Sequence, residues 1–455
     1  MGYAQAASLS GGFTAWRGAT LVVATGWGAP GKRVGEEIAH CGDDLQASAG
    51  EVAVWMETGK ALVVDIRPPW EHRQGHVPGA ANVPAGELPG YAPAIQAAVA
   101  SGRIEHVITH CAGRTRGIAA AALLRSLGVQ AAQALENGCM GWLLDGRKLE
   151  FGPGPDTGLR TTLPVAVTEA TSFVDPSPQR ARSISAEEIE ERRRSTRAFY
   201  LVDLRTPEAY LRGHIAGAVS LPAGQVLLES EAWLAIAALP IVLVGSSRAQ
   251  TNWVADHLHA LEFRDVAALD DGLDAWQGAD KPIETGRPPL QLPAISGDAS
   301  AQPISAAEFV AHPERWNVLD VRSAGEWGIG HLANSRCIPR GMLEGHIEEL
   351  GDAGLPLLLV SATGLRARLA RDTLSRNLSH SQDMAVLGGG INAAIAAGAR
   401  IVDDAPDSAT ASRDTPGRIT AAIWRMPLEK TRPLMLRYLA WEEALLATPH
   451  SRSLD

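Results

Sequence analysis

The chain has 455 residues, which is too long for one hydrophobic core and predicts about three domains. With 45% hydrophobic and 20% charged residues it has the composition of an ordinary globular protein, and no apolar stretch is long enough to span a membrane. The net charge of −10 at pH 7 argues against a surface that binds nucleic acid.

The four cysteines, Cys41, Cys111, Cys139 and Cys337, lie far apart in the sequence. They form no Cys-x-x-Cys pair and have no histidine at ligand spacing, so we expect neither a disulfide framework nor a metal site. The first thirty residues have neither the basic start nor the long apolar core of a secretion signal. We therefore expect a cytoplasmic protein that binds neither membranes nor nucleic acid.

One series of motifs occurs three times, at intervals of somewhat over a hundred residues. Each copy opens on a serine followed three residues later by a glutamate, which is the spacing of a helix capping box. An apolar strand then ends in Asp-x-Arg, and a glutamate and a Gly-His pair follow. The residues are Ser48, Glu51, Asp65, Arg67, Glu71, Gly75 and His76 in the first repeat, Ser185, Glu188, Asp203, Arg205, Glu208, Gly213 and His214 in the second, and Ser305, Glu308, Asp320, Arg322, Glu326, Gly330 and His331 in the third.

Each repeat closes on a glycine-rich turn that leads into a short helix, and this closing element occurs four times. The additional one stands near the start of the chain, so we expect residues 1–35 to be the C-terminal remnant of a repeat whose front is absent. Strands that alternate with helices predict the α/β class, with a mostly parallel sheet and helices on both faces in each repeat. The expected repeats are 41–155, 181–287 and 301–403.

The segments between the repeats, 152–182 and 285–303, are rich in Pro, Gly, Thr and Ser and indicate linkers, as does 403–417. Residues 418–450 then show helical spacing, interrupted by Pro427 and Pro433. We expect a helical tail that packs on the last domain. A helix that binds a partner protein is the less favoured interpretation.

Cys111 lies between a short β-branched run, 107–109, and a run with helical spacing, 118–127. It is therefore expected where a strand ends and a helix begins, so the free N–H groups of the turn and the positive end of the helix dipole point at its sulfur. Arg114 and Arg116 add positive charge, which is expected to favour the thiolate and to hold an anion. The alternative is that Cys111 is a small buried apolar residue.

The motifs, taken in order, resemble the rhodanese (thiosulfate sulfurtransferase) homology domain. The resemblance covers nearly all of residues 1–400, and it is specific because five motifs recur in the same order three times. The chain is similar to bacterial proteins with several rhodanese domains in tandem, here with the first one cut short. The family's active-site loop falls on the catalytic Cys111 and on the substrate-binding residues Ala112, Gly113, Arg114, Thr115 and Arg116.

In the other two repeats Gly245 and Ser361 stand where Cys111 stands in the first. Neither residue can form a persulfide, so the resemblance implies that these repeats are silent in sulfur transfer. Asp65, Arg67, Glu71 and His76 have counterparts in the silent repeats, which favours a supporting role for them. We therefore expect tandem rhodanese-like domains, of which one is catalytic and two keep the supporting residues without the catalytic cysteine.

The resemblance implies a thiosulfate sulfurtransferase that needs no metal or organic cofactor. Sulfane sulfur would pass from thiosulfate, or a related donor, through a Cys111 persulfide to cyanide or a thiol. The alternative is a sulfur-relay or protein-binding module in which the repeats without cysteine hold partners. A homodimer and a protein sulfur acceptor are left open.

Three further interpretations are less favoured. Phosphatase or arsenate reductase chemistry requires five residues between cysteine and arginine, whereas four separate Cys111 from Arg116. His110 could assist deprotonation, but a histidine at a buried strand end is more often packed and hydrogen-bonded. Cys139 could resolve a persulfide, but its counterparts in the other closing elements are plain apolar residues.

Overall fold

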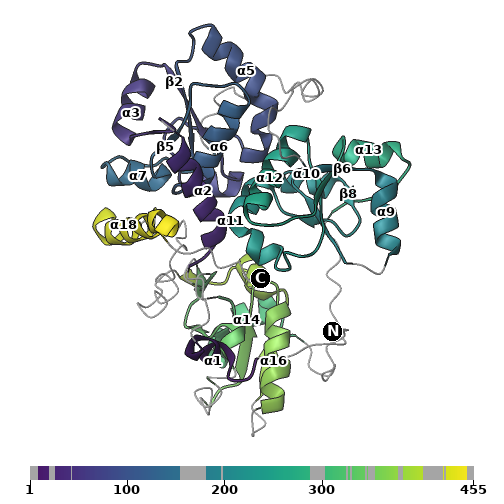
Figure 1. Cartoon of the computed structure of the whole chain (residues 1–455). Helices are drawn as coiled ribbons and strands as arrows, with labels where there is room; N and C mark the ends of the chain where they lie inside the picture. The colour runs from purple at the N-terminus through teal and green to yellow at the C-terminus, as the bar shows by residue number, and fades with distance from the viewer. Residues whose placement is uncertain are drawn as a thin grey trace. The chain divides into compact units, whose positions relative to one another are not determined.

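The computed structural model shows a series of sheets and helices that follows the repeats (Figure 1). It describes residues 9–19, 26–42, 44–153, 181–195, 198–286, 303–323, 326–327, 330–343, 346, 354–377, 383–402, 424 and 427–447. Most of the three predicted linker segments lies outside these ranges. No helix in the described ranges is long and apolar enough to cross a lipid bilayer.

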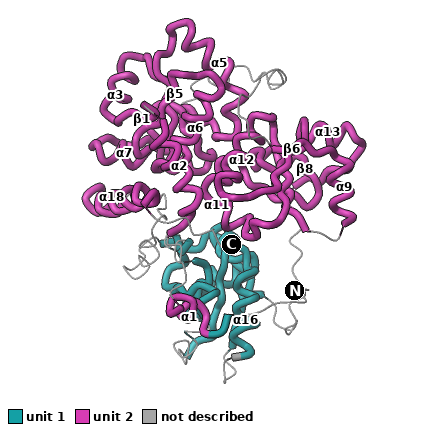
Figure 2. The backbone as a smooth tube through the Cα atoms, viewed as in Figure 1, with its two compact units in different colours: residues 1–10, 290–420 teal, residues 11–289, 421–455 magenta. Residues whose placement is uncertain are grey.

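The chain divides into two compact units (Figure 2). One unit contains residues 1–10 and 290–420, and therefore the third repeat. The other contains residues 11–289 and 421–455, and therefore the first and second repeats together with the C-terminal segment.

The first repeat is built on a five-stranded sheet with the order β1-β5-β4-β2-β3, in which all neighbouring strands are parallel. In chain order its elements are β1 (Gln46–Ala47), α3 (Ala49–Glu57), β2 (Ala61–Asp65), α4 (Pro69–His72), β3 (Ala81–Asn82), η1 (Ala85–Glu87), α5 (Leu88–Ala100), β4 (His106–His110), α6 (Thr115–Ser126), β5 (Ala132–Leu135) and α7 (Gly138–Leu144).

The second repeat has the same order of parallel strands, β6-β11-β10-β7-β9, and adds an antiparallel pair of β8 with β12. Its elements are β6 (Arg182–Ile184), α9 (Ala186–Arg194), β7 (Tyr200–Asp203), α10 (Pro207–Arg212), β8 (His214–Ile215), β9 (Val219–Ser220), α11 (Ala223–Trp233), β10 (Ile241–Val244), α12 (Arg248–Ala260), β11 (Val266–Leu269), α13 (Gly272–Gly278) and β12 (Ile283–Glu284).

The third repeat keeps four of these strands, in the order β15-β13-β16-β17, and pairs β14 with β18 in the antiparallel sense. Its elements are α14 (Ala306–Ala311), η3 (Pro313–Arg315), β13 (Asn317–Asp320), β14 (His331–Leu332), β15 (Arg336–Cys337), β16 (Leu357–Val360), α16 (Leu365–Asn377), β17 (Met384–Val386), α17 (Gly390–Ala396) and β18 (Ile401–Val402).

Helices cover both faces of each sheet, as the second repeat illustrates. Ile241 and Leu243 of β10 point to one face and pack with residues of α11 and α12. Val242 and Val244 point to the other face, where they pack with residues of α9, α10 and α13. This alternation follows from the period of two along a strand, and a central parallel strand buried on both sides must be apolar throughout. The predicted α/β fold class is confirmed.

The serine and glutamate pairs begin helices as predicted. Ser48 and Ser185 form capping boxes with Glu51 and Glu188, in which each side chain binds the other residue's backbone N–H. In the third repeat the Ser305 hydroxyl accepts a hydrogen bond from the backbone N–H three residues later. These contacts fix where the first helix of each repeat begins.

Three α-helices outside the repeats, α1 (Gly12–Gly18), α2 and α18, belong to the same unit as the first repeat. α2 (Ala29–Cys41) was not predicted and runs across the interval between residues 35 and 41; it contacts α6, α11 and α12. α18 (Leu428–Glu443), with η7 (Ala444–Ala447), contacts α2 and α7. The expectation that the C-terminal helix packs on the last repeat was wrong, because its buried face meets the first repeat instead. No observation on the described residues tests the remnant predicted at 1–35.

The glycine-rich closing turn of each repeat packs against the loop that follows the central strand. In the first repeat Asn137 and Gly138 both have left-handed backbone angles, with φ of 59° and 52°. The Cys139 N–H then donates to the Cys111 carbonyl at 3.0 Å. The same contact recurs in the third repeat, from the Ile391 N–H to the Ser361 carbonyl at 2.9 Å. The glycine is needed because the turn approaches the loop backbone so closely.

Replacing Gly138 with alanine should destabilise the first repeat by more than backbone strain alone. The new Cβ would lie 2.4 Å from the Cys111 carbonyl oxygen and 2.6 Å from that of Gly113, so the loop must shift. Gly146 is a matched control, because it also has a positive φ but nothing lies within 4 Å of its Cβ position. A left-handed alanine costs about 1–2 kcal/mol by itself.

Calorimetry of the full chain should therefore show a transition lowered by several degrees more in Gly138→Ala than in Gly146→Ala. Equal shifts in the two variants would contradict the close packing of the turn on the loop.

Candidate active site

Cys111 follows the last residue of β4 and precedes α6, as the sequence predicts. The backbone N–H groups of Gly113 and Gly117 form hydrogen bonds to its sulfur, and both lower the pKa of the thiol. The loop therefore surrounds the sulfur with main-chain donors at the start of a helix. These donors suit a sulfur that carries negative charge.

The Cys111 thiol is nevertheless enclosed, with 3% of the residue exposed. Burial is the largest influence and raises its pKa above the ordinary value, against the lowering effect of Arg116. Glu442 raises it further. Arg116 favours the thiolate as expected, but desolvation outweighs its charge, so the thiol rather than the thiolate is favoured overall.

Both loop arginines are bound by carboxylates. Arg116 donates to Glu71 at 2.9 and 2.6 Å, and burial, which alone would raise the pKa of Glu71, is outweighed by this arginine so that the pKa is lowered. Arg114 donates to Glu36 of α2 at 2.7 and 2.8 Å and also lies 3.2 Å from Glu443 of α18. Their charges are therefore largely balanced before any substrate anion arrives.

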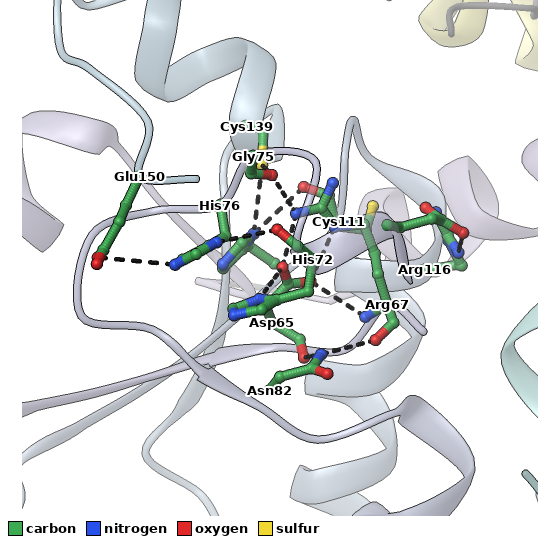
Figure 3. Close-up of polar contacts among 12 residues, drawn as sticks. Asp65, Arg67, His72, Gly75, His76, Asn82, Cys111, Arg116, Cys139 and Glu150 are labelled. Atoms are coloured by element: carbon green, nitrogen blue, oxygen red, sulfur yellow. Dashed lines mark hydrogen bonds and ion pairs between the residues drawn. The ribbon is translucent and has the colours of Figure 1, made fainter. Parts of the chain in front are cut away.

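The Asp-x-Arg motif forms a buried clamp at the end of β2 (Figure 3). Arg67 donates to the two carboxylate oxygens of Asp65 at 2.9 and 2.6 Å and to the Gly75 carbonyl at 2.6 Å. Burial opposes ionisation of Asp65, but Arg67 and the hydrogen bonds from Arg67 and His72 hold its pKa well below the usual range. The clamp ties the loop before Gly75 to the strand end.

The clamp recurs in both repeats that lack the cysteine. Arg205 binds Asp203 and donates to the Gly213 carbonyl at 2.7 Å, and Arg322 binds Asp320 and donates to the Gly330 carbonyl at 2.9 Å. A contact that persists without the nucleophile does not depend on its chemistry. The geometry therefore agrees with a supporting role for Asp65 and Arg67.

His76 is also part of the frame. Its Nδ1 is 2.9 Å from the His72 carbonyl oxygen and its ring stacks on the His72 ring with centroids 3.7 Å apart. In the other repeats the histidine of the Gly-His pair stacks in the same way, on Tyr210 and on Trp327. His72 differs from these two aromatic residues because its Nδ1 also contacts Asp65, at 2.8 Å. Sequence comparison of the repeats missed His72, since no residue type is shared at its position.

Glu71 contacts the Cys111 loop through Arg116. The sequence predicts a supporting role for Glu71 but not this contact. The third repeat contains the same pair, with Arg366 donating to Glu326 at 2.7 and 2.5 Å. In the second repeat Gln250 stands where Arg116 stands in the first. The pair is thus kept in two repeats of three, and only one of those two has a cysteine after its central strand.

His110 precedes Cys111 in the sequence, and Cys139 lies beside the Cys111 loop in the fold, where its N–H donates to the Cys111 carbonyl. Burial lowers the pKa of His110 to about 4, and its Nδ1 contacts the Cys111 carbonyl oxygen rather than the thiol. Burial raises the pKa of Cys139 to about 12, and its sulfur lies beside the Gly75 carbonyl (Figure 3). Both residues form part of the packed interior.

The loops of the second and third repeats have diverged in different ways. A Cβ at Gly245 would lie 2.7 Å from Gln250 Oε1 and 2.6 Å from Thr251 Cγ2, so the place of the thiol is filled. The Ser361 hydroxyl instead accepts hydrogen bonds from the N–H groups of Gly364 and Ala367, at 3.1 and 3.3 Å. The third repeat has kept the donors around its side chain, whereas the second has lost the space.

Side chains from outside the repeats cover the Cys111 loop. Thr115 donates to Glu442 of α18 at 2.5 Å, and a Cβ at Gly113 would lie 3.2 Å from the Tyr438 ring. Lys32 of α2 lies over the Tyr438 ring, 5.2 Å from its centroid. This cover could not be predicted from the sequence, because its residues are far from the loop in the chain. The loop residues Ala112 to Arg116 thus face protein side chains on several sides.

A cleft of about 780 Å³ opens between the first and second repeats, lined by Arg73, Tyr91, Arg212 and other residues. Cys111 does not line it. Within the described residues, no group of three or more His, Cys, Asp or Glu side chains could hold a metal ion.

The Rhodanese-like domain family matches residues 48–145, 185–279 and 305–397. A solved structure of thiosulfate sulfurtransferase from Pseudomonas aeruginosa is similar to 98% of this chain over 82% of its own, with 27% identity and a TM-score of 0.74. A rhodanese-related protein from Thermoplasma volcanium is similar to 22% of this chain over 98% of its own, with 28% identity and a TM-score of 0.21. Among curated protein sequences no match is found.

The three matched segments together cover more than half of the chain, and they coincide with the three sheets and with the three copies of the Asp-Arg clamp. The chain therefore belongs to the rhodanese-like domain family, as a member with rhodanese-like domains in tandem.

Proposed function

We propose that the protein is a sulfurtransferase that carries sulfane sulfur on Cys111. The observation that supports this most strongly is the contrast between the repeats. All three keep the same clamp and the same closing turn, but only the first has a thiol at the end of its central strand, with N–H groups of Gly113 and Gly117 directed at the sulfur. The similarity to a thiosulfate sulfurtransferase over nearly the whole chain agrees with this proposal.

The reaction that we propose has two steps. The Cys111 thiolate attacks the outer sulfur of thiosulfate, the bond between the two sulfurs of the donor breaks, and sulfite leaves with the electron pair. The persulfide then gives its terminal sulfur to cyanide or to a thiol, and the thiolate returns. The loop N–H groups and Arg116 would stabilise negative charge on the terminal sulfur, since fixed donors at a buried site are more effective than water.

In the second repeat, the segment that corresponds to the Cys111 loop contacts the first repeat. Gln250, which fills the place of the missing thiol, also donates from Nε2 to the Gly86 carbonyl of the first repeat at 2.8 Å. Gln225 of α11 lies 3.3 Å from Arg116. We therefore propose that the second repeat supports the first by packing against it, rather than by transferring sulfur.

Substitution of Cys111 by serine should abolish the formation of thiocyanate from thiosulfate and cyanide, because a hydroxyl cannot carry the sulfur. The exposed Cys41 is the matched control, and Cys41→Ser should leave the rate unchanged. Thiocyanate is measured by its colour with iron(III). Turnover that survives in Cys111→Ser would contradict the proposal.

A cysteine placed in the third repeat should accept sulfur, whereas one in the second should not. In a Cys111→Ser background, Ser361→Cys keeps the two N–H donors around the new sulfur, but Gly245→Cys places a side chain against Gln250 and Thr251. Mass spectrometry after treatment with thiosulfate should show an added sulfur at position 361 alone. Loading at position 245 but not at 361 would mean that the loop donors do not decide reactivity.

The reactivity of Cys111 should increase with pH through the neutral range. Its pKa is raised by burial, so the thiolate is the minor form at pH 7 and its fraction grows by about tenfold per pH unit below the pKa. The measurement is the rate of alkylation by iodoacetamide, located on the Cys111 peptide, from pH 6 to 9. A plateau that begins below pH 7 would show that the thiol is already ionised there.

A further inference from the structure

Glu442 is the feature of the active site that rhodanese-like sequence motifs do not explain. It lies on α18, outside the three repeats, and 1% of the residue is exposed. Its Oε1 accepts the hydrogen bond from Thr115 at 2.5 Å. Its Oε2 would lie 3.5 Å from a Cβ at Gly113. A carboxylate thus stands against the loop that holds the nucleophile.

A neighbouring cation stabilises the Glu442 carboxylate beside the loop. The Lys32 ammonium lies close to it and favours the ionised carboxylate, while burial opposes ionisation and raises its pKa. Lys32 is itself fixed, since its Nζ donates to the Trp27 carbonyl at 2.7 Å and lies 5.1 Å from the Trp441 ring centroid. α2 and α18 therefore bring a lysine and a glutamate to the loop as a pair.

The loop cations near Glu442 are already bound by other carboxylates. Arg116 forms an ion pair with Glu71, and Arg114 forms ion pairs with Glu36 and Glu443. A donor with two negative charges would therefore meet a further carboxylate and no uncompensated arginine. Like charges in a site that excludes water repel more strongly than at a surface.

In the third repeat, the described residues leave the equivalent ion pair more exposed. Arg366 and Glu326 correspond to Arg116 and Glu71, but the Arg366 side chain is 37% exposed whereas that of Arg116 is 5% exposed. Burial of the loop pair thus accompanies the repeat that has a cysteine after its central strand. Glu442 also raises the pKa of the Cys111 thiol, because its charge disfavours the thiolate.

We propose that Glu442 is a specificity-determining residue, which makes the Cys111 site favour sulfane donors with one negative charge over dianionic thiosulfate. This inference rests on the proposed sulfur transfer through Cys111 and names the donor class. Thiosulfonates are such donors: they carry the same outer sulfur, but one oxyanion is replaced by a carbon group. Thiosulfate then remains a substrate, but a poor one.

Methanethiosulfonate is the appropriate probe, because it is close to thiosulfate in size and differs by one charge. With either donor the Cys111 thiolate forms a bond to the outer sulfur, and the sulfur–sulfur bond of the donor breaks. The leaving group departs with the electron pair, as sulfite from thiosulfate or as methanesulfinate from methanethiosulfonate. The two reactions leave the same persulfide on the protein, so their rates can be compared directly.

The test is the second-order rate constant for persulfide formation on Cys111, measured by rapid mixing and mass spectrometry in the full chain. In Glu442→Gln the rate with thiosulfate should rise roughly tenfold relative to the rate with methanethiosulfonate, which corresponds to about 1.4 kcal/mol of repulsion removed. Glu442→Asp keeps the charge and should keep the preference of the natural protein. Glu429→Gln removes an exposed charge from the first turn of the same helix and should change neither rate.

The outcomes are distinguishable. An unchanged ratio of the two rates in Glu442→Gln, with Cys111 still loaded, would overturn the specificity role and leave the proposed function standing. An equal loss of rate with both donors would also overturn it, since Glu442 would then be a positioning residue. If neither donor adds sulfur to Cys111 in the natural protein or in Glu442→Gln, the proposed function itself fails, and the inference with it.

Discussion

An aspartate and an arginine hold the end of the strand beside the central strand in every repeat, and the rest of the architecture depends on this pair. The arginine binds the carboxylate and also a glycine carbonyl eight residues further on. One side chain therefore connects the strand end to the far end of the loop that follows it. Two charges taken out of water are stable only when each is paired and hydrogen-bonded, and the clamp meets this requirement. The loop that follows the neighbouring strand can then vary without loss of the frame.

Because the clamp does not depend on the catalytic cysteine, the repeats can differ in the loop that follows the central strand. The first keeps a cysteine among main-chain donors, the third keeps the donors around a serine, and the second has filled the place with Gln250. The loop has diverged, while the closing glycine turn and the clamp remain. In the second repeat the altered loop forms a contact with the first, so loss of a thiol accompanies gain of a packing surface.

The Cys111 sulfur is more enclosed than a substrate-ready nucleophile would be. Main-chain donors and Arg116 favour the thiolate, but burial and Glu442 favour the thiol, and the second pair of effects prevails. The side chains responsible come from α18 and α2, which lie over the loop. Tyr438 and Glu442 lie directly against Gly113 and Thr115, so the cover belongs to the site as much as the loop does.

Much of the fold could be predicted from the sequence, because the signals are local. The capping serines, the strands before Asp-x-Arg, the glycine turns and the position of Cys111 at a strand end all follow from patterns within a few residues. The cover of the site could not be predicted, because Thr115 and Glu442 are 327 residues apart and no motif connects them. α2 could have been found from Pro30 with Val34 and Ile38 at helical spacing, but its contact with Arg114 could not.

The central claim is that one sulfur atom in the chain, that of Cys111, carries the transferred sulfur. Its most direct test is mass spectrometry of the intact protein and of its peptides after incubation with a sulfane donor and removal of the excess. The account predicts one added sulfur atom per chain, located on the peptide that contains Cys111 and removed by cyanide. An added sulfur on the peptides of Cys41, Cys139 or Cys337, or none on any peptide, would contradict it.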